Sequence, residues 1–263
     1  MVEILECLRV GGNAPLKTIS DFDSISARDI CLDGIGIIHQ PRLEEIRDMG
    51  FDKYRNCLAF ISIDMDSLTK VLKISEEKIP EGLVPFDIFS IDAKAMEILL
   101  SALQPFFVSK LEFSEKHKAI VSVSVGSNNS FLGKIDRENF PLVRNVIMEI
   151  SGLEIKDDFN AKPKNEKAKK IMEQLAKGRA KLAASKRNKK EEERNSLWNI
   201  IGAVAACSST YNLTNIWQLT VLQLYDQFAR INNRFYLDIM ATRWCAWGED
   251  KFDHDPWYSV PEK

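Results

Sequence analysis

The sequence predicts an α+β protein with an N-terminal α+β domain, a charged helical linker and a C-terminal all-helical subdomain that ends in an aromatic tail. Three observations predict this class. The strand-like apolar runs all fall in the first part of the chain, apolar residues nearly vanish from the middle, and all five tryptophans lie in the last quarter. The corresponding boundaries are 1–155, 156–195, 196–248 and 249–263.

The N-terminal domain carries signals for both helices and strands. Pro41 suits a first helical turn and Gly50 can end that helix. In the run 119–125, Val121, Val123 and Val125 alternate with serines, which is the period of a half-buried strand. The predicted helices are 41–49, 51–63, 91–107 and 140–150, and the predicted strands are 35–38, 111–113, 119–125 and 131–135.

The linker is strongly basic in an otherwise acidic chain. Residues 162–194 hold 13 Lys/Arg and 5 Asp/Glu, whereas the whole chain has a net charge of −2. The segment has high helix propensity but few apolar residues, which predicts an exposed helix. A solvated linker, a docking site for an acidic or amphipathic protein, and a nucleic-acid contact all remain open, although the segment has no aromatic residue on which bases could stack.

The C-terminal part predicts three helices and a tail. The run 197–207 predicts a buried helix, and we expect Trp198 and Trp217 in the core of the helical subdomain. After a break at 211–215, Thr220 and Gln223 form a capping box that starts a second helix, and 234–247 predicts a third. The acidic tail 249–263 carries Phe252, Trp257 and Tyr258, a pattern typical of a peptide that docks into a groove.

Composition and motifs disfavour several classes of function. An apolar content of 45% excludes a disordered chain, and apolar runs such as 200–207 are far shorter than the ~20 residues that span a bilayer. The sequence has no GxSxG, Walker, GxGxxG or HExxH motif. Its cysteines and histidines are widely spaced, and Asp253-His254-Asp255 is expected to be a solvated tail rather than a metal site. We therefore expect a cytoplasmic protein that is not an enzyme and has no metal, cofactor, membrane partner or small-molecule substrate.

The order of several segments carries a family resemblance. Four parts follow one another: Pro41–Ile46 with Gly50–Tyr54, the Lys/Glu-rich stretch 162–194, the block Asn215–Asp226, and Gly248–Lys251 with Trp257 downstream. In this order the chain resembles tail assembly chaperones from the tail gene modules of phages that infect Gram-positive bacteria. The strand-rich segment 110–135 matches no part of that pattern.

The resemblance implies a non-enzymatic function in the host cytoplasm. Such chaperones coat the long tape measure protein, contact other tail proteins and associate in many copies while tube subunits assemble. The residues then expected to bind partners are Trp217, Leu219, Leu224, Tyr225, Phe228, Trp244, Trp247, Trp257 and Tyr258. The first alternative is a structural component of the virion, in tail, baseplate or neck. The second is a nucleic-acid-associated protein that acts through 162–194.

Overall fold

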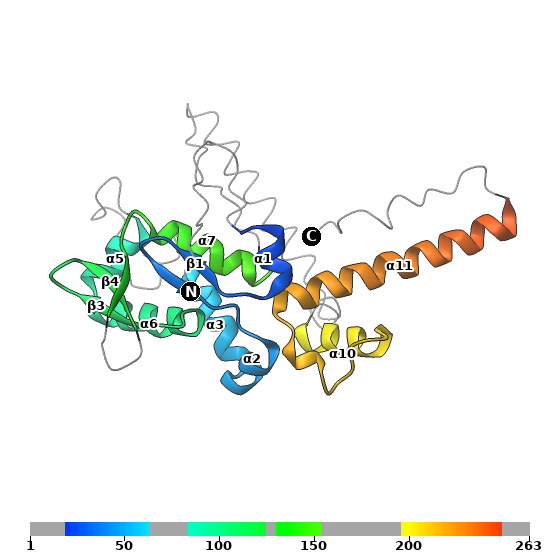
Figure 1. Cartoon of the computed structure of the whole chain (residues 1–263), viewed down its shortest axis with the longest axis horizontal. Helices are drawn as coiled ribbons and strands as arrows, with labels where there is room; N and C mark the ends of the chain where they lie inside the picture. The colour runs from blue at the N-terminus through cyan, green and yellow to red at the C-terminus, as the bar shows by residue number, and fades with distance from the viewer. Residues whose placement is uncertain (1–18, 64–83, 125–129, 154–195, 249–263) are drawn as a thin grey trace, which may run out of the picture. The chain divides into compact units, whose positions relative to one another are not determined.

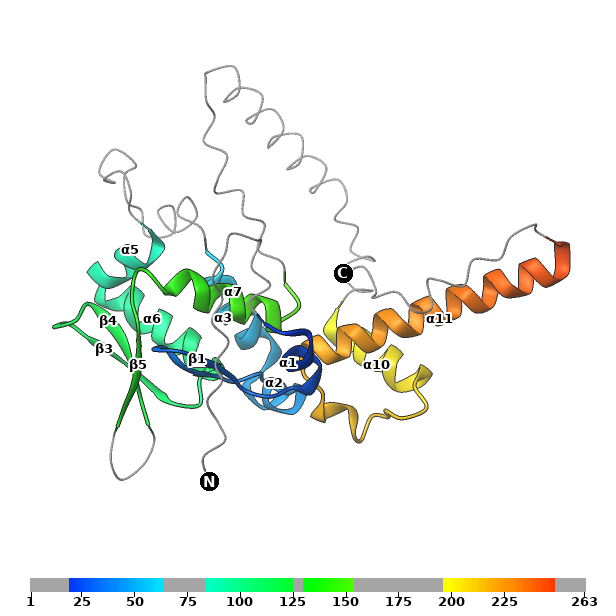
Figure 2. The ribbon, with the colours of Figure 1, turned by 45° about the horizontal axis from the view of Figure 1, so that its top comes forward.

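The structure is a computed structural model that describes residues 19–63, 84–124, 130–153 and 196–248 (Figures 1 and 2). The predicted linker 156–195 and tail 249–263, with Trp257 and Tyr258, lie outside the described residues. The chain divides into two compact units. The first unit comprises Met1–Ile155 together with Trp217–Gln223, and the second comprises Lys156–Ile216 and Leu224–Lys263.

The first unit mixes helices with short antiparallel strands. Its described helices are α1 (Asp21–Ser26), α2 (Leu43–Met49), α3 (Phe51–Ile61), α5 (Pro85–Ile91), α6 (Ala93–Leu103), the 3-10 helix η2 (Gln104–Phe106) and α7 (Phe140–Ile150). Its described strands are β1 (Ile30–Leu32), β2 (Gly36–Ile38), β3 (Lys110–Ser114), β4 (Ala119–Val123) and β5 (Phe131–Ile135). The α+β class predicted from the sequence is confirmed.

The strands form two small sheets. β1 and β2 make a hairpin in which Ile30 pairs with Ile38. β3, β4 and β5 form an antiparallel sheet in that order, with a bulge at Ser122/Val123. Within β4, Ile120 and Ser122 are buried, whereas Val121 and Val123 of the predicted alternation are half-buried. Ser122 is satisfied in this position because its hydroxyl is hydrogen-bonded to that of Ser109, which is also buried.

The core of the first unit is built on aromatic side chains from separate helices. Phe89 of α5 is fully buried, and its ring centroid lies 5.3 Å from that of Phe60 and 6.3 Å from that of Phe140. Phe86, one turn earlier, contacts the same Phe140 ring at 5.3 Å. Helix α6 packs against α3, α5 and β3, and buries Leu99 and Leu103.

Glycine is required at position 133, where β5 passes the turn between β1 and β2. The N–H of Lys134 donates to the carbonyl of Gly34 at 2.9 Å, and a Cβ on Gly133 would lie 2.6 Å from that oxygen. We therefore expect Gly133→Ala to lower the free energy of unfolding by about 1–3 kcal/mol in urea denaturation, since the backbone would have to move. Gly202, within a helix of the second unit, has open space around its Cβ position. Gly202→Ala should stabilise by about 0.4–1 kcal/mol; equal stabilities of the two variants would contradict this packing.

The second unit contains α10 (Leu197–Cys207) and most of α11 (Val221–Trp247). The 3-10 helix η4 (Ile216–Gln218) lies between them in the sequence, with Ile216 in the second unit and its last two residues in the first. Helix α10 buries Leu197, Ile200, Ile201 and Val204, but Trp198 is 72% exposed, so the expected core position of Trp198 is wrong. The two predicted helices after residue 220 are a single helix, because the stretch between them contains neither glycine nor proline and Arg230 pairs with Asp226 one turn earlier at 2.8 Å. Among the described helices, none is long and apolar enough to cross a membrane.

Candidate functional site

The residues Trp217–Gln223, hereafter the 217–223 segment, lie against helices α1 and α2 within the first unit. Arg42 and Thr220 form an antiparallel bridge, and the N–H of Leu43 donates to the carbonyl of Leu219 at 2.8 Å. The side-chain amide of Gln223 donates to the carbonyl of Ile25 at 2.6 Å. The segment therefore joins elements that are far apart in the sequence.

Two of the predicted partner-binding residues belong to this segment. Leu219 is buried. The indole of Trp217 is half-buried beneath Arg47, whose guanidinium carbon lies 5.2 Å from the ring centroid. This geometry is that of a cation–π contact. The structure thus places Trp217 and Leu219 in packing contacts of the first unit, whereas the sequence placed both in the helical subdomain.

The start of α11 is fixed by the predicted capping box, which the structure confirms. The side chain of Gln223 accepts from the N–H of Thr220 at 3.1 Å, and the hydroxyl of Thr220 accepts from the N–H of Gln223 at 3.3 Å. Thr220 is almost fully buried, so these bonds are shielded from water. The first residues of α11 are therefore positioned by the same segment that contacts α2.

Three further predicted residues lie near the start of α11, in the second unit. Leu224 is fully buried, and Tyr225 and Phe228 are half-buried. Burial raises the pKa of the Tyr225 phenol above its ordinary value, so the hydroxyl stays neutral at physiological pH. These side chains are covered mainly by the chain itself and offer a partner less surface than the sequence indicated.

The C-terminal half of α11, in contrast, exposes large apolar side chains. Trp244 and Trp247, both predicted partner-binding residues, are exposed, and Trp247 is 74% exposed. Phe235, Tyr236 and Ile239 are 52%, 58% and 61% exposed, and the sequence analysis missed all three. Their spacing could have revealed them, because residues 235, 236 and 239 share one helix face. Round the helix, Phe235, Tyr236, Ile239 and Trp247 lie within about 120° of one another, whereas Trp244 lies about 180° from Phe235. We call the first four of these residues the exposed apolar face of α11.

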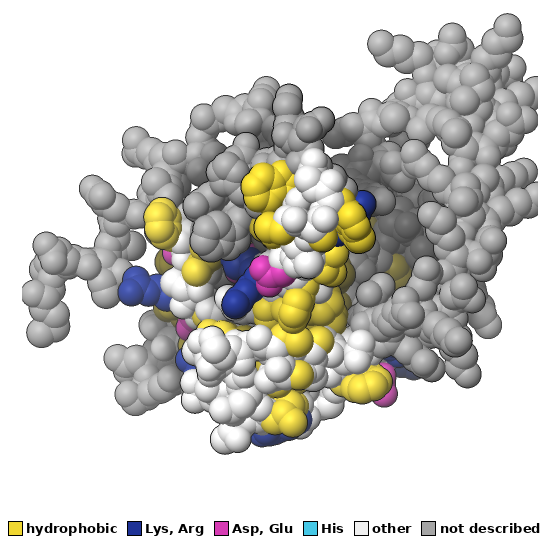
Figure 3. Space-filling view, turned by 90° about the vertical axis from the view of Figure 1, so that its right-hand side faces the viewer, with side chains coloured by type: hydrophobic (Ala, Val, Ile, Leu, Met, Phe, Trp, Pro, Cys, Tyr) yellow, Lys and Arg dark blue, Asp and Glu magenta, His cyan; other side chains and the backbone are white. Residues whose placement is uncertain are grey.

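Figure 3, viewed from the side on which α11 ends, shows hydrophobic side chains prominent among the described residues. Residues 235 and 239 lie one turn apart, and Trp247 lies about two turns beyond Ile239 and about 80° further round the helix, with the exposed Arg243 between them. Arg234 and Asp238 have the same spacing but lie about 100° further round the helix. The apolar face is therefore flanked by a polar one.

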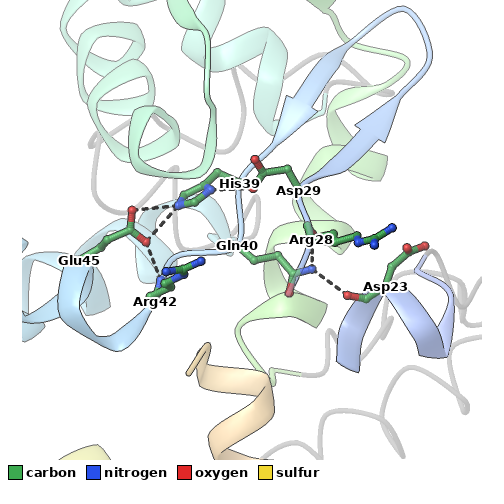
Figure 4. Close-up of polar contacts among 7 residues, drawn as sticks. All are labelled: Asp23, Arg28, Asp29, His39, Gln40, Arg42 and Glu45. Carbon is green, nitrogen blue, oxygen red and sulfur yellow. Dashed lines mark hydrogen bonds and ion pairs between the residues drawn. The ribbon is translucent and has the colours of Figure 1, made fainter. Parts of the chain in front are cut away.

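A polar cluster that the sequence analysis did not single out surrounds His39 (Figure 4). The ring Nδ1 lies 2.7 Å from Asp29 Oδ1, and the ring Nε2 lies 3.0 Å from Glu45 Oε2. Burial opposes the charged ring, but hydrogen bonds with Asp29 and Glu45 outweigh it and raise the pKa of His39 above its ordinary value. Burial also opposes the charged form of Glu45, but the Arg42 N–H and His39 outweigh it and lower the pKa of Glu45.

The His39 cluster does not have the geometry of a metal site. The two carboxylates lie at opposite nitrogens of one ring, so the three side chains do not converge on a common point. Among the described residues, no group of three or more His, Cys, Asp or Glu side chains could hold a metal ion. The Asp253-His254-Asp255 cluster lies outside the residues that the structure describes.

A surface cavity of about 360 Å³ lies beside α5 and the strands of the larger sheet. It is lined by side chains of both charges, and several of them pair with one another. Arg137 Nη1 lies 3.5 Å from Asp87, and Lys134 Nζ lies 2.9 Å from Asp136. Asp87 also accepts from the Val84 N–H at the start of α5, so it has a structural role.

The C-terminal part of the chain matches a known family model. Residues 187–260 match the family model of the YomV second domain. The match points to a phage-derived protein family. The matched residues include all of α10 and α11, and therefore the exposed apolar face of α11. Neither a curated protein nor a solved structure matches the chain.

Proposed function

We propose that this chain is a non-enzymatic phage tail assembly chaperone that binds the tape measure protein through the exposed apolar face of α11. The observation that carries the proposal is the exposure of Phe235, Tyr236, Ile239 and Trp247 on one helix. Groups of exposed apolar side chains mark interaction sites, because their exposure to water is unfavourable in free energy and a bound partner removes that exposure. Burying each side chain contributes about 1.5–3 kcal/mol.

The chemistry of the face favours a helical partner. An amphipathic helix binds by placing apolar side chains, spaced one turn apart, against a matching apolar strip. The exposed apolar face of α11 offers Phe235 and Ile239 one turn apart and Trp247 about two turns beyond, over about 18 Å at 1.5 Å per residue, with Arg243 between Ile239 and Trp247. A tape measure protein, as the resemblance implies, is a long helical chain with apolar stripes that would aggregate in water. Covering those stripes requires many copies of the chaperone, so we include self-association in the proposal.

The family match supports the phage context of this proposal. It covers the residues that form the exposed face, and it points to a phage-derived family. We propose the host cell cytoplasm as the site of action, with other tail proteins as further partners. A structural component of the virion is the alternative, and it would remain in finished particles.

Co-expression tests the proposal. A tape measure protein from the same phage should be insoluble when expressed alone and soluble when expressed with this chain, because the chaperone covers its apolar stripes. The measurement is the soluble fraction after centrifugation, with an unrelated helical protein of similar size as the control. An unchanged soluble fraction would contradict the proposed function. Detection of the chain in purified, finished particles would favour the virion component.

A further inference from the structure

The geometry around His39 requires a charged ring. Both ring nitrogens lie within hydrogen-bond distance of a carboxylate, Asp29 on one side and Glu45 on the other. A neutral imidazole has a single N–H and can donate to only one of them, whereas the imidazolium ion donates to both. Once the ring loses its proton, a lone pair on one nitrogen faces a carboxylate oxygen about 3 Å away, and that contact becomes repulsive.

One of the two carboxylates is connected to the 217–223 segment. Glu45 Oε2 also accepts from the backbone N–H of Arg42 at 2.7 Å, which caps the start of α2. Arg42 is the residue that pairs with Thr220, and the next N–H, that of Leu43, donates to Leu219. A displacement of Glu45 would therefore loosen the piece of backbone to which the segment is hydrogen-bonded.

We propose that His39 is a pH-sensitive switch that sets how firmly the 217–223 segment, and with it the first turn of α11, is held against α2. With the ring charged, Asp29 and Glu45 are both held and the start of α2 is fixed. With the ring neutral, one carboxylate is repelled and the contact with the segment weakens. This inference does not depend on the proposed function.

The other charged groups near His39 do not reverse the direction of this pH dependence. They are Arg28, which precedes β1, Asp23 on α1 and Arg42 at the start of α2 (Figure 4). Glu44, also at the start of α2, is a fourth. Arg42 pairs with Glu44 at 3.8 Å, and Asp23 accepts from the hydroxyl of Ser20. From η2, the carbonyl of Phe106 accepts the backbone N–H of His39, which fixes the position of the residue without involving its ring.

The pKa shifts define the pH range of the firm state. The pKa of His39 is raised, so its contribution is complete below the ordinary value of 6.5 and is lost as the pH rises through the raised value. The pKa of Glu45 is lowered, so its contribution is present above the ordinary value of 4.5 and is lost as the pH falls through the lowered value. The 217–223 segment should be held most firmly at pH values between the lowered pKa of Glu45 and the raised pKa of His39.

Amide hydrogen exchange measured by NMR on the whole chain tests the switch. The readout is a ratio, the protection factor of the Leu43 amide divided by that of the Ile147 amide, measured at pH values from about 6 to 9. Ile147 lies in α7, and its protection reports the stability of the core. We expect this ratio to fall severalfold as the pH rises. His39→Gln should abolish the pH dependence, and Glu45→Gln should reduce it while leaving an oxygen that accepts from Arg42.

The matched control is His117→Gln, because His117 is an exposed histidine in the turn between β3 and β4. This variant should keep the full pH dependence of the Leu43 ratio. The proposal is overturned if the ratio is independent of pH in the unaltered chain, or if it falls equally in the His39→Gln variant. Should His39→Gln fail to fold, the same comparison is made with the Glu45→Gln variant. A smaller fall of the ratio in that variant supports the proposal, and an equal fall overturns it.

Discussion

Replacing Phe235 and Ile239 together by serine should weaken binding of the tape measure protein by at least about 30-fold. Both side chains are more than half exposed and lie one turn apart on α11, so they can enter a partner's apolar groove together. Loss of large side chains from the centre of an interface costs at least about 2 kcal/mol, which corresponds to that factor. The measurement is titration of the chain with a soluble helical fragment of the tape measure protein.

The chain offers a matched control for this double variant. Arg234 and Asp238 have the same spacing, are also exposed and lie one residue earlier on the same helix. Replacing both by serine should change the affinity by less than about threefold, because exposed charges outside an interface core contribute little. Circular dichroism should show the same helix content for both variants. Equal losses of affinity would mean that the apolar face is not the binding surface.

Replacing Phe89 by alanine should lower the free energy of unfolding by about 3–5 kcal/mol, as for other fully buried aromatic residues. The side chain is fully buried between the rings of Phe60 and Phe140, and its removal would leave a cavity that these rings cannot fill. Urea denaturation monitored by circular dichroism gives the change in midpoint.

The control for Phe89 lies two residues further along the same helix. Ile91 is 79% exposed, so Ile91→Ala should change the free energy of unfolding by less than about 0.5 kcal/mol. Since a domain of this size has a total stability of about 5–15 kcal/mol, the Phe89 variant would lose a large share of it. A small effect at Phe89 would show that the aromatic core of the first unit is not formed as described.

Local patterns in the sequence predicted most of the described elements. Apolar residues with helical spacing fixed α3 and α7, and the capping box of Thr220 with Gln223 located the start of α11. These features depend on residues within one or two helical turns of one another, so they can be recognised in the sequence alone. The burial of Ser122 in β4 could not be seen in the alternation of valines and serines, because it depends on a bond to Ser109, which lies just before the neighbouring strand β3.

The candidate sites were harder to predict, because they depend on contacts between residues that are far apart in the sequence. The bridge from Arg42 to Thr220 joins two segments that share no local pattern, so Trp217 was assigned to the helical subdomain. Likewise, nothing near His39 in the sequence indicates that Asp29 and Glu45 flank its ring. The exposed apolar face of α11 was predictable in part, because helical spacing groups Phe235, Tyr236 and Ile239, whereas their exposure depends on how the rest of the chain packs.

An affinity pull-down of the full chain from phage-infected cells, with mass spectrometry of the proteins that co-purify, tests the proposed chaperone function. We expect recovery of one very long helix-rich protein, with many copies of this chain per molecule, and loss of that protein with the Phe235→Ser/Ile239→Ser variant. Recovery of tube, sheath or baseplate proteins at a fixed low ratio would contradict the chaperone and favour a virion component. Recovery of nucleic acid alone, released at high salt, would contradict both.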